Sequence, residues 1–391
     1  MNKSVIIFST SDSRHVFNFI SVVLHDRKIY DDITIFDLAY IPSIPEQFAD
    51  YYRANNIKIV TPSHPVNCKI HSLKSLINFL SRTFALLRLR CKKKESFAYC
   101  FIHYCSWQSM LWSIIFRKHF TKTVPVFWGG DVLRNKHINN WVYRNALKHS
   151  AKIVLANENS LRVFNAATHN AFAQKATVIQ FPKKMVAAFL EYEQQMPPKK
   201  QLLQKFGYPN DKKIVLCGHT ATRAERYEEI IDELDLLPED LTSQCHFVFM
   251  MTYAPEEYIS YQNEVESLMQ TTGLSFTVEK KYMDYNTIQE LHNITDIHIT
   301  NIRTDALSCF LQEELLSGSI LVYGNWLKYY EIENPSFFAL PFGNIKELGT
   351  TLTYVLNNFD TLKKKSAINR QGIIKLASEE EIVSRWNKIL K

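Results

Sequence analysis

Residues 304–326 read TDALSCFLQEELLSGSILVYGNW, a polar loop followed by a helical pattern, a small-residue turn and an apolar run. Thr304 or Asp305 can cap the start of a helix, and leucine and phenylalanine then recur at helical spacing. Gly318 is typical of a helix end, and the ILVY run at 320–323 is typical of a strand buried on both faces. The stretch therefore predicts a helix and a parallel strand of an α/β sheet.

Acidic residues stand at two places in this stretch. Asp305 lies at the predicted helix start, and Glu313 follows about two turns later with Glu314 beside it. One interpretation is a capping Asp and a solvated pair of Glu. The other is a ligand site at the positive end of the helix, where hydroxyl and phosphate groups are bound. The rest of the chain favours the second interpretation.

Strand-like runs recur on both sides of this stretch, separated by helical patterns. They are residues 5–8, 33–36, 57–60, 98–104, 125–128, 153–156, 213–217, 246–251, 275–278, 296–300 and 320–323. Such alternation predicts parallel sheets with helices on both faces, and it places functional groups in the loops after the carboxyl ends of the strands.

The charge of the chain is divided unevenly. Residues 1–190 hold 26 Lys and Arg against 10 Asp and Glu, a net charge of +16, whereas residues 191–391 carry 20 against 29, a net charge of −9. With 391 residues in all, this predicts two domains that meet different partners. We expect a basic first domain at 1–190, a linker at 191–211, a second domain at 212–365, and C-terminal helices at 366–391 that can cross back to the first domain.

Composition excludes several classes of protein. No apolar run approaches the roughly 18 residues of a membrane-spanning helix, and the first residues read as a strand rather than a signal peptide. Seven scattered cysteines without a C-x-x-C pair argue against a zinc site or a disulfide framework. These features predict a cytoplasmic protein.

One helical pattern, residues 73–94, is strongly basic. Leucine, isoleucine and phenylalanine form one stripe along it, at 73, 76, 77, 80, 84 and 87, and Lys and Arg accumulate from Arg82 to Lys94. A basic amphipathic helix suits the anionic inner surface of a membrane. It is also compatible with a layer helix that has a solvated basic end. Nucleic acid is a third possible partner, but no nucleic-acid-binding motif accompanies the charge, so none is expected.

Polar loops in the first half supply candidate catalytic groups. The loop at 9–15 contains Asp12 and His15, and the paired glycines at 129–130 precede Asp131. Glycine lets the backbone approach a ligand closely, and each of these three side chains can accept a proton. The alternatives are a plain turn capped by Asp131 and a histidine with a purely structural hydrogen bond.

In the second half, the strand at 213–217 is followed by Gly218, Thr220, Arg223 and Arg226 before a helix. Backbone N–H groups and arginine at such a position suit a phosphate. Neither the P-loop motif nor the dinucleotide-binding fingerprint is present.

The order of these motifs resembles the GT-B glycosyltransferases, which have two Rossmann-like domains facing across a cleft. The chain is most similar to bacterial 4-acetamido-4,6-dideoxygalactose transferases that extend a lipid-linked saccharide, through the motifs FWGGD at 127–131, FPKKM at 181–185, IVLCG at 214–218 and MTYAP at 251–255 with Tyr258 beyond. The 304–326 stretch resembles the large retaining GT-B family, in which two acids separated by seven residues flank the donor; here they are Asp305 and Glu313.

The resemblance implies a nucleotide-sugar donor bound by the second domain and a lipid-linked or lipopolysaccharide acceptor met by the basic first domain. The implied donor site comprises Gly218, Thr220, Arg223, Arg226, Tyr253, Lys281, Asp305, Ala306, Leu307, Ser308 and Glu313. Asp12, His15 or Asp131 is implied as general base if the reaction inverts the sugar's configuration, and Asp305 is implied to face the reacting sugar. The pathway implied is the synthesis of a surface polysaccharide such as O-antigen or capsule, by an enzyme peripheral to the inner face of the membrane.

No D-x-D motif occurs in the chain, so no metal is expected; helix dipole and arginine would stabilise the diphosphate instead. Two other classes remain open. A GT-B-like enzyme that epimerises a nucleotide sugar would not need a strongly basic acceptor domain. A non-catalytic polysaccharide-assembly protein or a nucleic-acid-binding protein would not bind nucleotide sugars.

Overall fold

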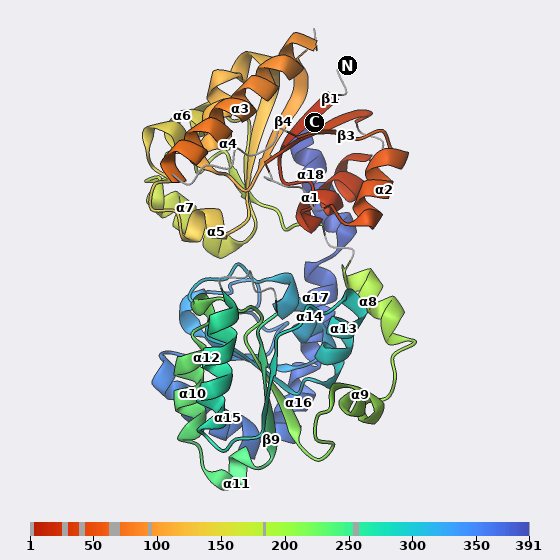
Figure 1. The fold of residues 1–391 in the computed structure, drawn as a ribbon, viewed down its shortest axis with the longest axis vertical. Helices are drawn as coiled ribbons and strands as arrows, with labels where there is room; N and C mark the ends of the chain where they lie inside the picture. Colours follow the sequence, from red (N-terminus) through yellow and green to blue (C-terminus); the bar gives the residue numbers. More distant parts are fainter. Residues whose placement is uncertain are drawn as a thin grey trace. The chain divides into compact units, whose positions relative to one another are not determined.

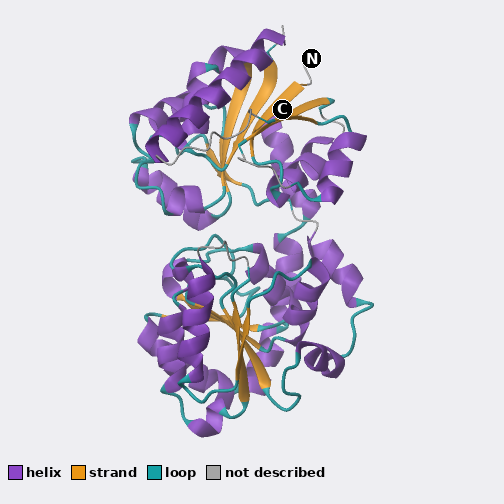
Figure 2. Ribbon diagram, viewed as in Figure 1, coloured by secondary structure: helices purple, strands orange, loops and turns teal. Residues whose placement is uncertain are grey.

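The computed structural model describes residues 4–25, 30–38, 44–61, 71–92, 96–182, 185–252 and 258–390. The chain divides into two compact units. Unit 1 comprises Met1–Lys184 together with Ser378–Lys391, and unit 2 comprises Met185–Ala377. Figure 1 and Figure 2 show that each unit is a sheet with helices on both faces.

Unit 1 contains a parallel sheet of seven strands in the order β3-β2-β1-β4-β5-β6-β7. The strands are β1 (Ser4–Ser9), β2 (Asp32–Asp37), β3 (Lys58–Val60), β4 (Phe97–His103), β5 (Phe120–Phe127), β6 (Ile153–Leu155) and β7 (Ala176–Val178). Its central strands are buried on both faces, as the continuous apolar runs predict.

Helices cover both faces of this sheet. They are α1 (Arg14–Asn18) with its π-helical continuation η1 (Phe19–His25), α2 (Glu46–Ala54), α3 (His71–Lys92), α4 (Trp107–Ile115), η2 (Arg117–His119), α5 (Gly130–Leu133), α6 (Trp141–His149), α7 (Glu158–Ala167) and α18 (Glu379–Leu390). In Figure 1, α3, α4 and α6 lie on one side of the sheet, and α1, α2 and α18 lie on the other.

The last helix belongs to unit 1 although the preceding residues belong to unit 2. Ile382 and Trp386 of α18 are buried in the same apolar cluster as Phe19. The Tyr99 hydroxyl donates a hydrogen bond to the carbonyl of Ile389 at 3.0 Å. The sequence-derived C-terminal segment at 366–391 is therefore split, with α18 alone packing in unit 1.

Unit 2 contains a second parallel sheet, of six strands in the order β10-β9-β8-β11-β12-β13. The strands are β8 (Lys213–Cys217), β9 (Cys245–Met250), β10 (Phe276–Glu279), β11 (Ile297–Thr300), β12 (Ile320–Gly324) and β13 (Ala339–Phe342). The helices are α8 (Met185–Glu193), α9 (Lys199–Phe206), η3 (Arg223–Glu225), α10 (Tyr227–Asp235), α11 (Glu239–Thr242), α12 (Ile259–Gln270), α13 (Tyr285–Ile294), α14 (Cys309–Ser317), η5 (Asn325–Leu327), η6 (Ile345–Glu347), α15 (Leu348–Asn357), α16 (Phe359–Ser366) and α17 (Ile368–Leu376).

The segment expected to be a linker, 191–211, is instead part of unit 2. The Tyr192 hydroxyl donates to Glu290 at 2.9 Å, Arg370 pairs with Glu193 at 2.8 Å, and Leu202 of α9 is fully buried. Its polar composition reflects one solvated helix face, and the apolar face packs on α13.

The 304–326 stretch folds as a loop, a helix, a turn and a strand, but the helix begins later than its sequence suggests. Ser308 is the N-cap, since its side chain accepts from the N–H of Leu311, and α14 begins at Cys309. Gly318 ends the helix in the left-handed conformation, at φ +84°. Asp305 thus lies in the loop before the helix and does not cap α14 directly.

Helix α3 packs with the opposite face from the one its apolar stripe suggests. The stripe residues Leu76, Leu80, Phe84 and Leu87 are exposed, while Arg82 is buried. Arg82 donates to the carbonyl of Leu38 at 2.6 Å and to Gln108 at 3.2 Å. Within the described part of the chain, no helix is long and apolar enough to cross a membrane.

Candidate functional site

The strand order of unit 2 reverses direction between β8 and β11. In an open parallel sheet this point creates a crevice at the carboxyl ends of the strands, where ligands bind. The loops that follow these two strands begin at Gly218 and Asn301, and they contain most of the donor residues named from sequence.

Gly218 is required by the backbone at the end of β8. Its φ is +63°, and its N–H donates to the carbonyl of Ile299 at 3.0 Å, which ties the loop to β11. A Cβ added at Gly218 would lie 2.4 Å from the hydroxyl oxygen of Tyr227. This hydroxyl lies 2.8 Å from the carbonyl oxygen of Thr220, so the glycine permits close packing of the loop on α10.

A buried carboxylate already satisfies the donors of this loop. Glu225 Oε1 accepts from the backbone N–H of His219 (3.3 Å) and of Thr220 (3.1 Å), and from the Thr220 hydroxyl (2.9 Å). Glu225 is fully buried. In the conformation described, Glu225 therefore accepts from two of the N–H groups of this loop that a phosphate would otherwise accept from.

The two arginines named from this loop have different environments. Arg226 is mostly buried; it donates to the carbonyl of Asn301 at 2.8 Å and to the Asn301 side chain at 3.0 Å, and it lies over the ring of Trp326. Arg226 therefore joins the two loops. Arg223 is exposed and pairs with Glu264 at 2.6 Å on the outer surface of α10 and α12, so it does not face the crevice residues described above.

The loop before α14 is held by Asp305. Its carboxylate accepts from the backbone N–H of Ser308 and from the hydroxyl of Tyr329, both at 2.9 Å. Leu307, which lies between Asp305 and Ser308 in the sequence, has a φ of +57°, in the left-handed region that leucine rarely adopts. Asp305 thus fixes a tight turn, and Ala306, Leu307 and Ser308 bring the backbone to the start of α14.

Glu313 does not lie on a solvated helix face. Its side chain is buried, and its Oε2 lies 3.1 Å from Nε2 of His292. The other ring nitrogen, Nδ1, lies 2.5 Å from Oε1 of Glu314. Burial lowers the pKa of His292, but the two neighbouring carboxylates outweigh this effect and raise the pKa above its usual value. Burial raises the pKa of Glu314, but the interaction with His292 outweighs it, so the pKa of Glu314 lies below its usual value.

The remaining donor residues lie apart from this cluster or outside the description. Tyr253 falls in 253–257, outside the described residues. Lys281 is exposed in the loop after β10. Sequence reasoning did not name Arg303, which follows β11, is exposed, and has no ion pair among the described residues. Its backbone N–H donates to the carbonyl of Ala224 at 2.8 Å, so it belongs to the same crevice loops.

In unit 1 the strand order reverses between β1 and β4, and aromatic rings gather at that edge. The ring of His15 lies 4.6 Å from that of Phe181 and 5.0 Å from that of Trp128. Trp128 Nε1 lies 3.3 Å from Nδ1 of His103, which is fully buried. Burial and the neighbouring His15 lower the pKa of His103 to about 3, so His103 is neutral.

Asp131 is engaged in holding the loop after β5. Oδ1 accepts from the N–H groups of Trp128 (2.8 Å) and Gly129 (3.0 Å), and Oδ2 accepts from the N–H of Cys105 (2.8 Å). Burial raises the pKa of Asp131 to about 6, although these backbone donors lower it. Asp12 is half-buried in the turn before α1, on the loop that also positions His15.

Sequence reasoning missed the partners that hold these candidates. Trp128 and Phe181 belong to the motifs at 127–131 and 181–185, so an aromatic residue next to glycine or proline could have indicated them. Nothing in the sequence indicated Glu225, His292 or Tyr329, because none of them belongs to a recognised motif and each acts through a contact that only the fold creates. Within the described residues, no three His, Cys, Asp or Glu side chains come together as metal ligands.

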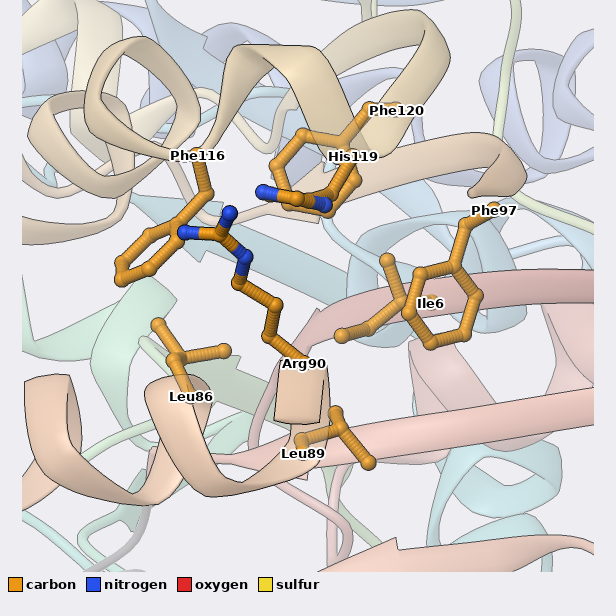
Figure 3. Close-up of a pocket in the computed structure, with 8 residues that line it drawn as sticks. All are labelled: Ile6, Leu86, Leu89, Arg90, Phe97, Phe116, His119 and Phe120. Carbon is orange, nitrogen blue, oxygen red and sulfur yellow. The ribbon is translucent and has the colours of Figure 1, made fainter. Parts of the chain in front are cut away.

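The apolar pocket of Figure 3 lies in unit 1, at the opposite end of β4 and β5 from the loops that follow these strands. It is lined by residues of β1, α3, η2 and the starts of β4 and β5, together with Phe116 just before η2, and Arg90 and His119 are its polar members. Its cavity volume of about 20 Å³ holds about one water molecule. It therefore cannot take a nucleotide in the conformation described.

Comparison of the whole structure with solved structures identifies the fold as GT-B. HepE from Anabaena, solved in complex with UDP, matches with a TM-score of 0.71 at 12% identity, covering 99% of each chain. Sucrose-phosphate synthase from Thermosynechococcus elongatus gives 0.73 at 11% identity, covering 99% of this chain and 98% of that one. A glycosyltransferase from Rickettsia africae gives 0.68 at 14% identity, covering 100% and 98%. No protein-family model matches the chain, and no curated protein matches it.

Proposed function

We propose that the protein is a glycosyltransferase that moves a sugar from a UDP-sugar donor to a saccharide acceptor. The observation that carries the proposal is the match of both units, over nearly the full chain, to GT-B structures that include one solved with UDP-glucose. The donor and acceptor would be bound by the crevices of unit 2 and unit 1, respectively. The donor sugar that we propose, from the resemblance of the sequence motifs, is 4-acetamido-4,6-dideoxygalactose.

On the donor side, Glu313 is the residue best suited to the ribose. One carboxylate oxygen lies beside His292, and the other is available to accept from a hydroxyl group. Asp305 holds the turn that places the start of α14 against the donor, where the helix dipole favours a diphosphate. Arg303 would supply the positive charge that stabilises the leaving UDP, in place of Arg223. We propose that no metal takes part.

On the acceptor side, His15 is the strongest candidate for the general base. It lies between Trp128 and Phe181, whose faces can also pack against a sugar ring. Asp12 on the same loop is the alternative base. Asp131 is better suited to positioning this loop, since both of its oxygens accept backbone hydrogen bonds.

The acceptor that we propose is a lipid-linked saccharide or lipopolysaccharide used in the synthesis of a bacterial surface polysaccharide, O-antigen or capsule. The excess of positive charge in residues 1–190 supports this choice, because lipid-linked acceptors carry phosphate groups on an anionic membrane. The enzyme would then work at the inner face of the membrane.

The test is calorimetric titration of the full chain with UDP and UDP-glucose, followed by an assay for UDP release with added acceptor. We expect binding, and we expect Glu313→Gln and Arg303→Gln each to weaken UDP binding about tenfold through loss of a charged hydrogen bond. The matched controls are Glu264→Gln and Arg385→Gln, an exposed acid and an exposed arginine outside the crevice, which should bind as wild type does.

Two results would overturn the proposal. One is the absence of binding to UDP and to UDP-glucose at millimolar concentration. The other is binding that Glu313→Gln and Arg303→Gln leave unchanged while both variants remain folded, since the nucleotide would then occupy a different site.

A further inference from the structure

Large apolar side chains are exposed together on one face of unit 1, which we call the α3–α4–α6 face. It consists of Leu76, Leu80, Phe84, Trp107, Ile115 and Trp141, which are between 48% and 67% exposed. Each belongs to one of three helices that lie on the same side of the sheet in Figure 1. Large apolar side chains that are exposed on one side of a protein indicate a site of interaction.

The exposure of this face results from how α3 is anchored. Its inner side packs Phe79 and Leu86 against the sheet and buries Arg82, whose guanidinium reaches the carbonyl of Leu38. Because a buried guanidinium with two hydrogen-bond acceptors is costly to remove, the helix cannot rotate its leucines inward. The outward direction of Leu80 and Phe84 is therefore built into the fold.

Contacts connect the three helices to one another. The ring of Trp107, the first residue of α4, stacks on Phe79 of α3 with centroids 5.7 Å apart. Trp107 and Ile115 stand eight residues apart on α4, which places them on one side of that helix. Helix α6 packs on α4, and Trp141 is its first residue.

The surroundings of this face are strongly basic. Residues 51–157 contain eighteen Lys and Arg but two acids, Glu95 and Asp131. Asp131 is buried, and Glu95 lies outside the described residues. The exposed basic side chains on and next to the three helices are Arg88, Arg90, Arg117, Lys118, Arg144 and Lys148. Arg88 lies over the ring of Phe84, so charge and apolar surface adjoin directly.

We propose that the α3–α4–α6 face docks on an anionic lipid bilayer, inserting Leu80, Phe84, Trp107 and Trp141 at the interface. Exposed Trp, Phe and Leu next to Arg and Lys are the composition of interfacial membrane contacts. A second copy of this chain would bring like charges together, which opposes docking of two such faces. Nucleic acid would pair with the charge but leave the apolar side chains in water.

The position of this face suits the proposed acceptor. Trp107 follows Tyr104 by three residues, and the ring of Tyr104 lies 5.7 Å from that of Trp128 in the acceptor crevice of unit 1. The start of α4 therefore links the docking face to the candidate acceptor loop. The link between docking and the acceptor rests on the proposed function, since a lipid-linked acceptor would reach that loop from the bilayer. The docking itself does not depend on catalysis.

The experiment is co-sedimentation of the purified full chain with vesicles of phosphatidylcholine and phosphatidylglycerol in equal parts. We expect binding that falls with added salt and that is much weaker for pure phosphatidylcholine vesicles. Leu80→Gln with Phe84→Gln should weaken partitioning at least about tenfold, and Arg88→Gln with Arg90→Gln should do so by about fivefold per charge. Brominated acyl chains should quench tryptophan fluorescence, and Trp107→Phe with Trp141→Phe should remove most of that quenching.

Matched controls lie in unit 2. Leu236→Gln with Ile259→Gln replaces two exposed apolar residues, and Lys200→Gln with Lys364→Gln removes two exposed charges; both should bind vesicles as wild type does. The proposal is overturned if wild type does not bind the anionic vesicles, or if the unit 1 and unit 2 variants bind alike. It is also overturned if Leu80→Gln with Phe84→Gln instead abolishes a dimer. UDP binding is measured in parallel; its failure counts against the proposed function and leaves the vesicle result intact.

Discussion

Nε2 of His292 lies 3.1 Å from Oε2 of Glu313, deep in unit 2 between α13 and α14. The same ring contacts Glu314 on its other side. A buried imidazole between two carboxylates is held as the imidazolium, which in turn keeps the Glu313 side chain in one orientation. His292 is therefore a positioning residue for Glu313 in the proposed donor site.

This relationship predicts a specific dependence of stability on pH. The folded-state pKa of His292 is raised to about 9 from 6.5, so its contribution is fully present below pH 6.5 and is lost as the pH rises through 9. His292→Gln should destabilise unit 2 by about 3–5 kcal/mol at pH 6, because it leaves buried carboxylates unpaired, and by less at pH 9.5. Urea unfolding at the two pH values measures the difference.

The control for this prediction is His246→Gln. His246 is also buried in unit 2, but its ring nitrogens contact Ser275 and Thr277, and burial lowers its pKa to about 4. At pH 6 this imidazole is largely protonated in the unfolded chain but neutral in the folded one, so His246→Gln should cost slightly less stability at pH 6 than at pH 9.5, the opposite direction to His292→Gln. Equal pH dependence in the two variants would refute the buried imidazolium.

The backbone at Gly218 predicts an unequal response to alanine. Gly218→Ala adds strain at φ +63° and a close contact with the Tyr227 hydroxyl, which together should cost about 2–4 kcal/mol of unfolding free energy. Gly207 has a similar φ of +74° with no atom within 4 Å of an added Cβ, so Gly207→Ala should cost about 1 kcal/mol. If the two variants unfold at the same urea concentration, the contact with Tyr227 has no energetic weight.

Asp131 predicts an effect in the acidic range. Its folded-state pKa is about 6 against 3.8 ordinarily, so wild type loses about 3 kcal/mol from this group as the pH rises from below 3.8 through 6. Asp131→Asn cannot titrate, and the stability gap between wild type and variant should therefore narrow by that amount. Chemical unfolding of unit 1 from pH 3 to pH 7 tests this, with Glu158→Gln on the surface as the control. A gap that stays constant would contradict the shift.

The two arginines after β8 should differ in their effect on stability. Arg226→Ala removes hydrogen bonds to Asn301 and the contact with Trp326, and we expect a loss of about 2 kcal/mol. Arg223→Ala removes exposed ion pairs and should leave unfolding unchanged within error. Thermal unfolding of both variants provides the comparison, and equal losses would show that Arg226 does not join the loops.

The alternation of apolar strands and helical patterns was sufficient to predict two Rossmann-like units, because a strand buried on both faces requires a continuous apolar run. Ser308 shows the limit of local patterns: Thr304, Asp305 and Ser308 are all good caps, and the contact of Asp305 with Tyr329 decides among them. The apolar stripe on α3 predicted the wrong buried face for a similar reason. Arg82 is expected to be exposed from its sequence, and only its distant acceptor, the carbonyl of Leu38, explains why it is buried.

Three features could be read directly from the amino-acid sequence: the order of strands and helices, the charge difference between the two halves, and the acids and glycines that follow β8 and β11. These properties depend only on neighbouring residues or on composition, so the sequence is enough to predict them. The contacts of the polar groups became known only from the folded structure: Glu225 accepts hydrogen bonds from the loop that begins at Gly218, and His292 contacts Glu313. A buried polar group needs a hydrogen-bonding partner, and that partner can come from any part of the sequence that the fold brings near.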